Sequence, residues 1–174
     1  MTVPAYRDLL GLASLMLAYP DEVVCGSRAE VIAALEPLPG STAKAELAEF
    51  GAWWAGRDPE GLREEYVATF DMRRGAALYV TYLTYQDSRS RGMALYDLKQ
   101  VYREAGYAPD PGELPDYLPT VCQFAALADA PAGATALRLA ADGVRAIHAA
   151  LVAQSSRYAL VLAAIGAIIE KGVA

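Results

Sequence analysis

The sequence has few of the residues from which catalytic and metal-binding sites are usually built. Its 174 residues include a single histidine, His148, and two cysteines, Cys25 and Cys122, that lie far apart. A single histidine supports neither a histidine-based metal cluster nor a Ser-His-Asp triad, and two distant cysteines fit no metal-binding spacing. Glycine-rich phosphate loops and EF-hand loops are also absent from the sequence. We therefore predict no catalytic residues, no metal site and no disulfide, with both cysteines packed as small apolar side chains.

Positive charge and long apolar runs are scarce as well. The chain has 15 lysines and arginines against 21 aspartates and glutamates, which gives a net charge of -6 at pH 7. This balance argues against binding to a nucleic-acid backbone and against a polybasic membrane anchor. It suits a positively charged partner such as a basic leader segment, although solubility alone also explains it. The longest apolar run, residues 159–169, is too short to span a bilayer, and the first residues lack the positive region of a signal peptide. We expect a cytoplasmic protein without direct membrane insertion.

Helical periodicity runs through nearly the whole chain, whereas strand alternation is almost absent. Hydrophobic residues make up 55% of the sequence and charged residues 21%, a composition typical of a globular protein. The length suits one core, and neither a linker nor an internal repeat divides it. We predict an all-α fold, a single-domain helical bundle over residues 1–174, with the apolar helix at residues 156–171 in its core.

Capping residues and helix breakers predict where the helices begin and end. Ser27 and Glu30 form a capping box for the second helix, and Asp116 is the expected N-cap of a later one. Asp58 followed by Pro59 gives a strong start for the helix that aligns Leu62, Tyr66 and Phe70. The expected helices begin near residues 4, 27, 41, 58, 90, 116, 134 and 156, with a turn at residues 129–133.

Residues 78–85 form an aromatic, partly β-branched run whose structure is ambiguous. A short strand is compatible with this composition, but the helical neighbours favour a buried helix. Charged residues gather beside the run, at Asp87, Arg89, Arg91 and Asp97. They are either a solvated helix start whose ion pairs contribute little, or the polar rim of an aromatic peptide-binding groove. The pattern alone leaves both interpretations open.

An ordered set of residues in this region resembles the NarJ-type nitrate reductase molybdenum cofactor assembly chaperones, also called delta subunits. These belong to the TorD/DmsD/NarJ superfamily of redox enzyme maturation proteins. The matching residues, in order, are Tyr66, Val67, Thr69, Phe70 and Asp71, then Asp87, Arg89, Arg91 and Gly92, then Leu95, Leu98, Tyr102 and Gly106, and finally Glu113, Leu114, Pro115, Asp116, Tyr117, Leu118 and Pro119. Many relatives carry histidine after the proline–aspartate pair, where this chain has Tyr117, so no histidine role is transferred.

The resemblance implies a TorD-like, all-helical chaperone that is not an enzyme. Such proteins bind the N-terminal peptide of the catalytic alpha subunit of nitrate reductase or a related molybdoenzyme. They keep the apoenzyme competent for insertion of the molybdenum bis(guanine dinucleotide) cofactor, and they delay membrane docking. The chaperone itself is expected to hold no cofactor stably. Neither the identity of the client nor the choice between monomer and dimer follows from the sequence.

The resemblance, together with the physics of a helix in a groove, predicts a peptide-binding site with an apolar floor and a polar rim. Pro115 is expected to set the edge of this groove, with Tyr117 beside it. Tyr66 and Phe70 are equally well explained as buried residues that hold the fold. The predicted floor is Tyr66, Phe70, Tyr79, Tyr82 and Phe124, and the predicted rim is Asp71, Asp87, Arg91, Glu113 and Asp116.

Two other classes of function stay open. A small helical enzyme would use the charges of Asp87, Arg91, Glu113 and Asp116, but no nucleophile or base pair accompanies them. A generic helical adaptor would bind a folded surface rather than a leader peptide.

Overall fold

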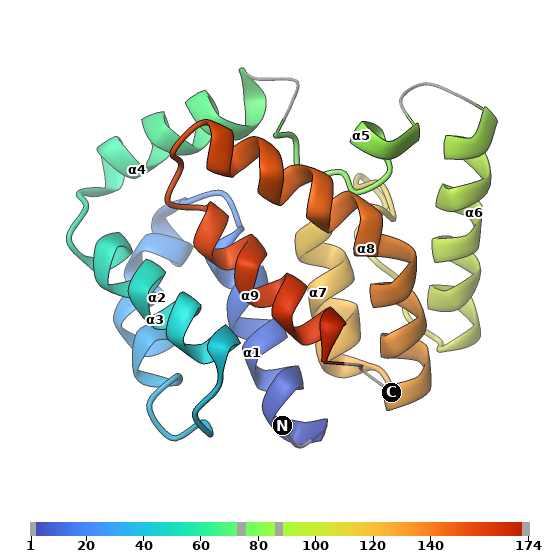
Figure 1. Cartoon of the computed structure of the whole chain (residues 1–174), viewed down its shortest axis with the longest axis horizontal. Coiled ribbons are helices and arrows are strands. Elements are labelled where there is room, and N and C mark those ends of the chain that lie inside the picture. Colours follow the sequence, from blue (N-terminus) through green and yellow to red (C-terminus); the bar gives the residue numbers. More distant parts are fainter. Residues whose placement is uncertain (1–2, 73–75, 86–88, 172–174) are drawn as a thin grey trace.

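The computed structural model describes residues 3–72, 76–85 and 89–171, with side chains from residue 6 onward. Within these ranges the regular structure is helical, apart from one isolated backbone bridge between Tyr79 and Tyr117 (Figure 1). The all-α prediction is therefore confirmed. The elements are α1 (Val3–Met16), α2 (Glu22–Ala33), α3 (Thr42–Ala55), α4 (Pro59–Tyr66), the π-helical turn η1 (Val67–Asp71), α5 (Tyr82–Tyr85), α6 (Arg89–Glu104), α7 (Leu118–Leu127), α8 (Ala130–Ala153) and α9 (Ala159–Glu170).

Two of the predicted helix starts are confirmed by their capping hydrogen bonds. Ser41 caps α3 by accepting a hydrogen bond from the backbone N–H of Lys44. Asp58 caps α4 by accepting from the N–H of Gly61, and Pro59 occupies the first helical turn. These side chains satisfy backbone donors that the first turn of a helix leaves without partners.

Three other boundaries were predicted wrongly. Helix α2 begins at Glu22, because Asp21 caps it by accepting from the N–H of Val24 at 2.8 Å, and Ser27 lies inside the helix. Asp129 was expected in a turn but caps α8. Asp116, the expected cap of α7, is buried and turned away from that helix, which begins at Leu118 without a side-chain cap. The sequence alone does not show which candidate N-cap residue has its backbone in the extended conformation that an N-cap needs.

The prediction of a buried helix at residues 78–85 is wrong, because the first half of that run is not helical and α5, in the second half, has no buried residue. Residues 78–80, called the extended segment from here on, pair with the chain just before α7. The N–H of Val80 donates to the carbonyl of Asp116 at 3.0 Å, and the N–H of Leu118 donates to the carbonyl of Leu78 at 2.7 Å. The short α5 follows. Pairing with a segment almost forty residues away outweighs the helical preference of the neighbours.

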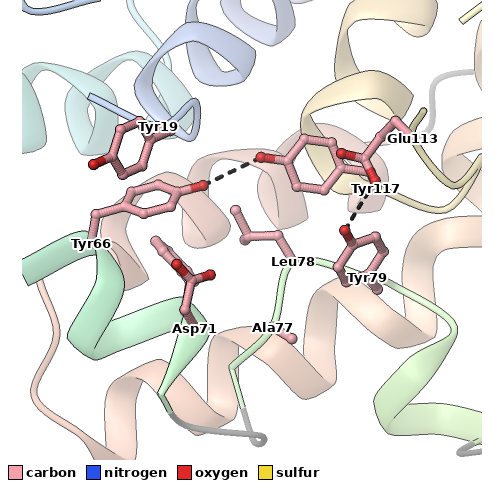
Figure 2. Close-up of a pocket in the computed structure, with 9 residues that line it drawn as sticks. Tyr19, Tyr66, Asp71, Ala77, Leu78, Tyr79, Glu113 and Tyr117 are labelled. Atoms are coloured by element: carbon pink, nitrogen blue, oxygen red, sulfur yellow. Dashed lines mark hydrogen bonds between the residues drawn. The ribbon is translucent and has the colours of Figure 1, made fainter. Parts of the chain in front are cut away.

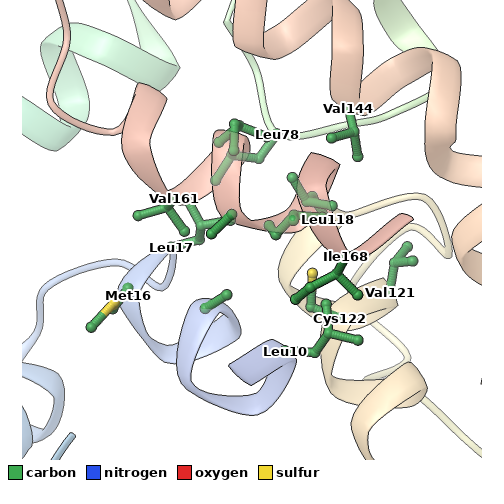
Figure 3. Close-up of a cluster of buried hydrophobic side chains, with 14 of the residues drawn as sticks. Leu10, Met16, Leu17, Leu78, Leu118, Val121, Cys122, Val144, Val161 and Ile168 are labelled. Carbon is green, nitrogen blue, oxygen red and sulfur yellow. The ribbon is translucent and has the colours of Figure 1, made fainter. Parts of the chain in front are cut away.

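The core lies where α9 crosses between its neighbours (Figure 1). Helix α1 packs along α7, α3 packs along α9, and α8 packs on both α7 and α9. Figure 3 shows the cluster at this junction, in which Leu10 from α1, Cys122 from α7 and Ile168 from α9 are fully buried. Helix α9 is thus a core helix, as its apolar sequence predicts. Both cysteines are free, and burial raises the pKa of the Cys122 thiol to about 12.

Gly143 on α8 lets the extended segment lie directly against that helix. A Cβ at this position would overlap the carbonyl oxygen of Val80. Only glycine permits such a close approach of one backbone to another. The contact sets how closely residues 78–80 approach α8. This segment contributes to one wall of the site described below.

Candidate functional site

A pocket of about 230 Å³ opens between the end of α4, the extended segment and the loop before α7 (Figure 2). Four of its residues are tyrosines, so we call it the tyrosine pocket. Its lining consists of Tyr19, Tyr66, Phe70, Asp71, Ala77, Leu78, Tyr79, Glu113 and Tyr117.

One wall comes from the end of α4 and from η1. The Tyr66 hydroxyl donates to the carbonyl of Leu17 at 3.0 Å, which ties α4 to the end of α1. The Tyr66 ring meets the edge of the Tyr19 ring at a centroid distance of 5.5 Å and packs against Phe70 at 4.8 Å. In η1 the N–H of Met72 bonds to the carbonyl of Val67, five residues back. This wide turn carries Phe70 and Asp71, and both line the pocket; such π-helical turns occur frequently at functional sites.

The opposite wall comes from the bridge between Tyr79 and Tyr117. Their rings lie 5.5 Å apart, because paired residues of antiparallel segments place their side chains on the same face. The Tyr79 hydroxyl donates to Oε1 of Glu113 at 3.0 Å. The Tyr117 hydroxyl lies 3.3 Å from the Tyr66 hydroxyl and joins the two walls (Figure 2). Since Tyr66 gives its proton to Leu17, Tyr117 is the donor of that bond.

The raised pKa values of Tyr66, Tyr79 and Tyr117 keep these three side chains uncharged at neutral pH. Burial raises the pKa of Tyr66 and of Tyr117 above the ordinary tyrosine value. Burial and the hydrogen bond to Glu113 raise the pKa of Tyr79 to about 12. Among the described residues, the lining holds no lysine, arginine or histidine, and its formal charges are the carboxylates of Asp71 and Glu113.

The structure brings half of the predicted site residues into this pocket. Tyr66 and Phe70 are 5% exposed members of the hydrophobic core and also line the pocket. Tyr19 also lines the pocket and was not among the predicted site residues. The predicted residues that line the pocket are Tyr66, Phe70, Asp71, Tyr79, Glu113 and Tyr117.

Asp116 does not form an exposed rim, because its side chain is fully buried behind the wall. Its Oδ2 accepts hydrogen bonds from the backbone N–H and the hydroxyl of Thr81. The Arg91 guanidinium donates to the Thr81 hydroxyl oxygen at 3.2 Å and lies 3.9 Å from Asp116. Asp116 therefore fastens the extended segment to the loop before α7, and its place in the sequence motif reflects this structural role.

The remaining predicted residues lie outside the pocket. The Arg91 guanidinium stands over the ring of Tyr82 at 5.4 Å. The carbonyl of Pro115 accepts a hydrogen bond from Tyr102. Phe124 is fully buried against Tyr102 and Tyr107, so it belongs to the core rather than to a groove floor. Asp87 lies outside the described residues.

Two kinds of feature, a metal-binding cluster and a membrane-spanning helix, are absent from the described part of the chain. Over residues 3–72, 76–85 and 89–171, no three His, Cys, Asp or Glu side chains are grouped so that they could hold a metal ion. None of the helices described there combines the length and the apolar character needed to cross a membrane.

Comparison with known proteins identifies the family. Residues 36–164 match the family described as nitrate reductase delta subunit. The chain belongs to the nitrate reductase delta subunit family. This confirms the resemblance found in the motifs.

The delta subunit relatives match most of this chain. A Bacillus subtilis (strain 168) protein named as a probable nitrate reductase molybdenum cofactor assembly chaperone, NarJ, is 34% identical over 90% of this chain and 85% of its own length. The Escherichia coli (strain K12) nitrate reductase molybdenum cofactor assembly chaperone NarJ is 30% identical over 87% of this chain and 65% of its own length. The nitrate reductase-like protein NarX of Mycobacterium tuberculosis (strain ATCC 25618 / H37Rv) is 35% identical over 88% of this chain, which matches only 23% of that longer protein.

A solved structure supports the delta subunit fold. The chain superposes on a crystal structure described as a candidate redox enzyme maturation protein from Archaeoglobus fulgidus, with a TM-score of 0.69. The superposition covers 94% of this chain and 93% of the other, at 23% sequence identity. At that identity the likeness concerns the fold, and it agrees with the predicted TorD-like architecture.

Proposed function

We propose that this delta subunit family member is an assembly chaperone for a nitrate reductase or a related molybdoenzyme. It acts in the cytoplasm and binds the N-terminal segment of the catalytic alpha subunit. Binding keeps the apoenzyme competent for insertion of the molybdenum bis(guanine dinucleotide) cofactor and delays membrane docking. The cofactor is cargo for the client, and no residue of this chain is proposed to hold it. The observation that carries the proposal is similarity, over 90% of the chain, to a protein named as such a chaperone.

The tyrosine pocket is the proposed contact for the client segment. Tyrosine offers a large, rigid contact area together with a polar tip, which suits an amphipathic peptide. Hydrogen bonds to Leu17 and Glu113 already fix the Tyr66 and Tyr79 side chains. A site whose side chains are ordered before binding loses less conformational entropy when the peptide arrives. The ring of Tyr19, which is 45% exposed, offers further contact area at the mouth of the pocket.

Calorimetric titration tests the proposal. The titrant is a synthetic N-terminal peptide of the molybdoenzyme catalytic subunit encoded beside this chain, and a scrambled peptide is the control. We expect saturable binding of the native peptide with a negative heat-capacity change, because apolar surface becomes buried. Equal binding of the native and scrambled peptides would contradict a leader-binding chaperone and would favour the adaptor alternative.

A further inference from the structure

We propose that the tyrosine pocket receives one cationic side chain, an arginine or a lysine, from the client segment. This inference rests on the proposed function, because it assumes that a client peptide occupies the pocket.

The charge of the pocket lining is negative. Asp71 is exposed at one wall, and Glu113 stands at the other. The Tyr79 hydroxyl and the N–H of Leu114 both bond to Oε1 of Glu113, and neither bond uses its Oε2. A guanidinium or ammonium group between the walls would therefore find carboxylate oxygens as acceptors for charge-assisted hydrogen bonds.

The arginines nearest in the structure or the sequence do not belong to the described lining. Arg91 is directed to Thr81 and Asp116 behind the wall. Arg73 and Arg74 follow Asp71 in the sequence and lie outside the described residues. Among the described lining residues, the formal charges are therefore the two negative charges of Asp71 and Glu113.

The aromatic rings favour the same occupant. Tyr19 and Tyr66 meet nearly at right angles, with an interplanar angle of 89°, and on the opposite wall the rings of Tyr79 and Tyr117 are tilted by 42° to each other. Ring faces attract cations, and the attraction is stronger where water is excluded. The pKa values of Tyr66, Tyr79 and Tyr117 are raised, so these three rings are neutral at physiological pH.

Other occupants match the lining less well. An apolar side chain would contact the rings but would move two carboxylates toward a less hydrated environment without giving them a partner. An acidic side chain would be repelled by both carboxylates. A cationic side chain is complementary to the rings and to the carboxylates at once. The net charge of -6 on the whole chain also attracts a cationic peptide.

The test combines charge removal on both partners. In the protein, the pocket variant is Asp71→Asn with Glu113→Gln, in which the amide oxygen that replaces the carboxylate can still accept the Tyr79 hydrogen bond. The control variant is Glu64→Gln with Asp97→Asn, because both of these side chains are exposed, neither lines the pocket, and the same two charges are lost. In the native client peptide, each arginine is replaced in turn by citrulline and each lysine by norleucine.

We expect the pocket variant to weaken binding of the native peptide about tenfold at low salt, the order expected for a desolvated cation with aromatic and carboxylate partners. The control variant should change the affinity less than about twofold, as exposed charges do. One peptide substitution should lose as much affinity as the pocket variant, and that peptide should no longer distinguish the pocket variant from the wild type. This coupling would locate the cation in the pocket.

Equal weakening by the pocket and control variants, or no weakening by either, would overturn the inference while leaving peptide binding itself established. Failure of the wild-type protein to bind the native peptide at all would instead contradict the proposed function, and the inference with it. Melting temperatures of both variants within a few degrees of the wild type would show that the affinity changes are not caused by unfolding.

Discussion

At the level of single residues, the wall of the tyrosine pocket depends on the buried contact between Asp116 and Thr81. Asp116 accepts two hydrogen bonds from Thr81, and its side chain has no exposed surface. Replacing Asp116 by alanine would leave the N–H and the hydroxyl of Thr81 without this acceptor inside the protein. Buried donors that lose their partner cost about 1 to 3 kcal/mol each.

We therefore predict that Asp116→Ala lowers the free energy of unfolding by about 3 kcal/mol, measured by urea denaturation. The matched control is Asp97→Ala on the exposed face of α6, which should change the stability by less than about 0.5 kcal/mol. Equal stability of the two variants would show that Asp116 does not hold the wall.

The sequence predicts residue types better than it predicts residue roles. Six of the predicted site residues line the pocket, five from the motifs and Tyr79 from the aromatic run, and two of them, Tyr66 and Phe70, are also buried as the alternative interpretation expected. Asp116 was misplaced because a carboxylate after a proline is typical of a cap, and Thr81, its actual partner, lies 35 residues earlier in the chain. Such a long-range pair leaves no local signal.

At the level of elements, the close contact between α8 and the extended segment decides the shape of the pocket. Gly143 allows this contact, because any Cβ there would overlap the Val80 carbonyl oxygen. The neighbouring core helix α9 contains a second interior glycine, Gly166, where an added Cβ would meet nothing within 4 Å. The two glycines therefore make a matched pair.

We predict that Gly143→Ala destabilises the protein by about 3 kcal/mol or more, because the segment must move away from α8. It should also weaken binding of the client peptide, since Leu78 and Tyr79 belong to the same segment. By contrast, Gly166→Ala should leave the stability unchanged or raise it by up to about 1 kcal/mol, as expected in an open helical position. Thermal and urea denaturation of both variants measure this difference. A Gly143→Ala variant as stable as Gly166→Ala would refute the close contact.

Helix positions follow from periodicity, whereas the extended segment does not. The apolar spacing of α3, α4, α8 and α9 is local and strong, and all four helices are present, although α8 begins at Ala130 rather than near residue 134. Residues 78–80 take their conformation from hydrogen bonds to Asp116 and Leu118. A preference set by a distant partner is invisible in a local window of sequence.

At the level of the whole molecule, burial of ionisable side chains limits stability at high pH. Burial raises the pKa of Cys122 and of Tyr79 to about 12, and it raises the pKa values of Tyr66, Tyr102 and Tyr158 as well. The unfolded chain releases these protons at the ordinary values, near 9 for cysteine and 10 for tyrosine. Above those values the folded state binds more protons than the unfolded state, so the stability that is present at neutral pH must decrease as the pH rises.

We therefore predict that the free energy of unfolding falls steadily from about pH 9 upward, as followed by urea denaturation at a series of pH values. A Tyr102→Phe variant, which removes one of these groups, should show a shallower decrease above about pH 10. A free energy of unfolding that stays constant up to about pH 11 would contradict the burial of these groups.

Binding of the client segment in the tyrosine pocket is tested most directly by comparing the peptide dissociation constants of two matched variants. Tyr19 lies at the mouth of the pocket and is 45% exposed, whereas Tyr96 on α6 is 55% exposed and does not line the pocket. Both can be replaced by alanine with little loss of core packing. We expect Tyr19→Ala to weaken binding of the native peptide about tenfold or more, as for an aromatic contact at a binding site, and Tyr96→Ala to leave the affinity unchanged. Equal affinities of the two variants, or a larger loss in Tyr96→Ala, would place the client elsewhere on the molecule.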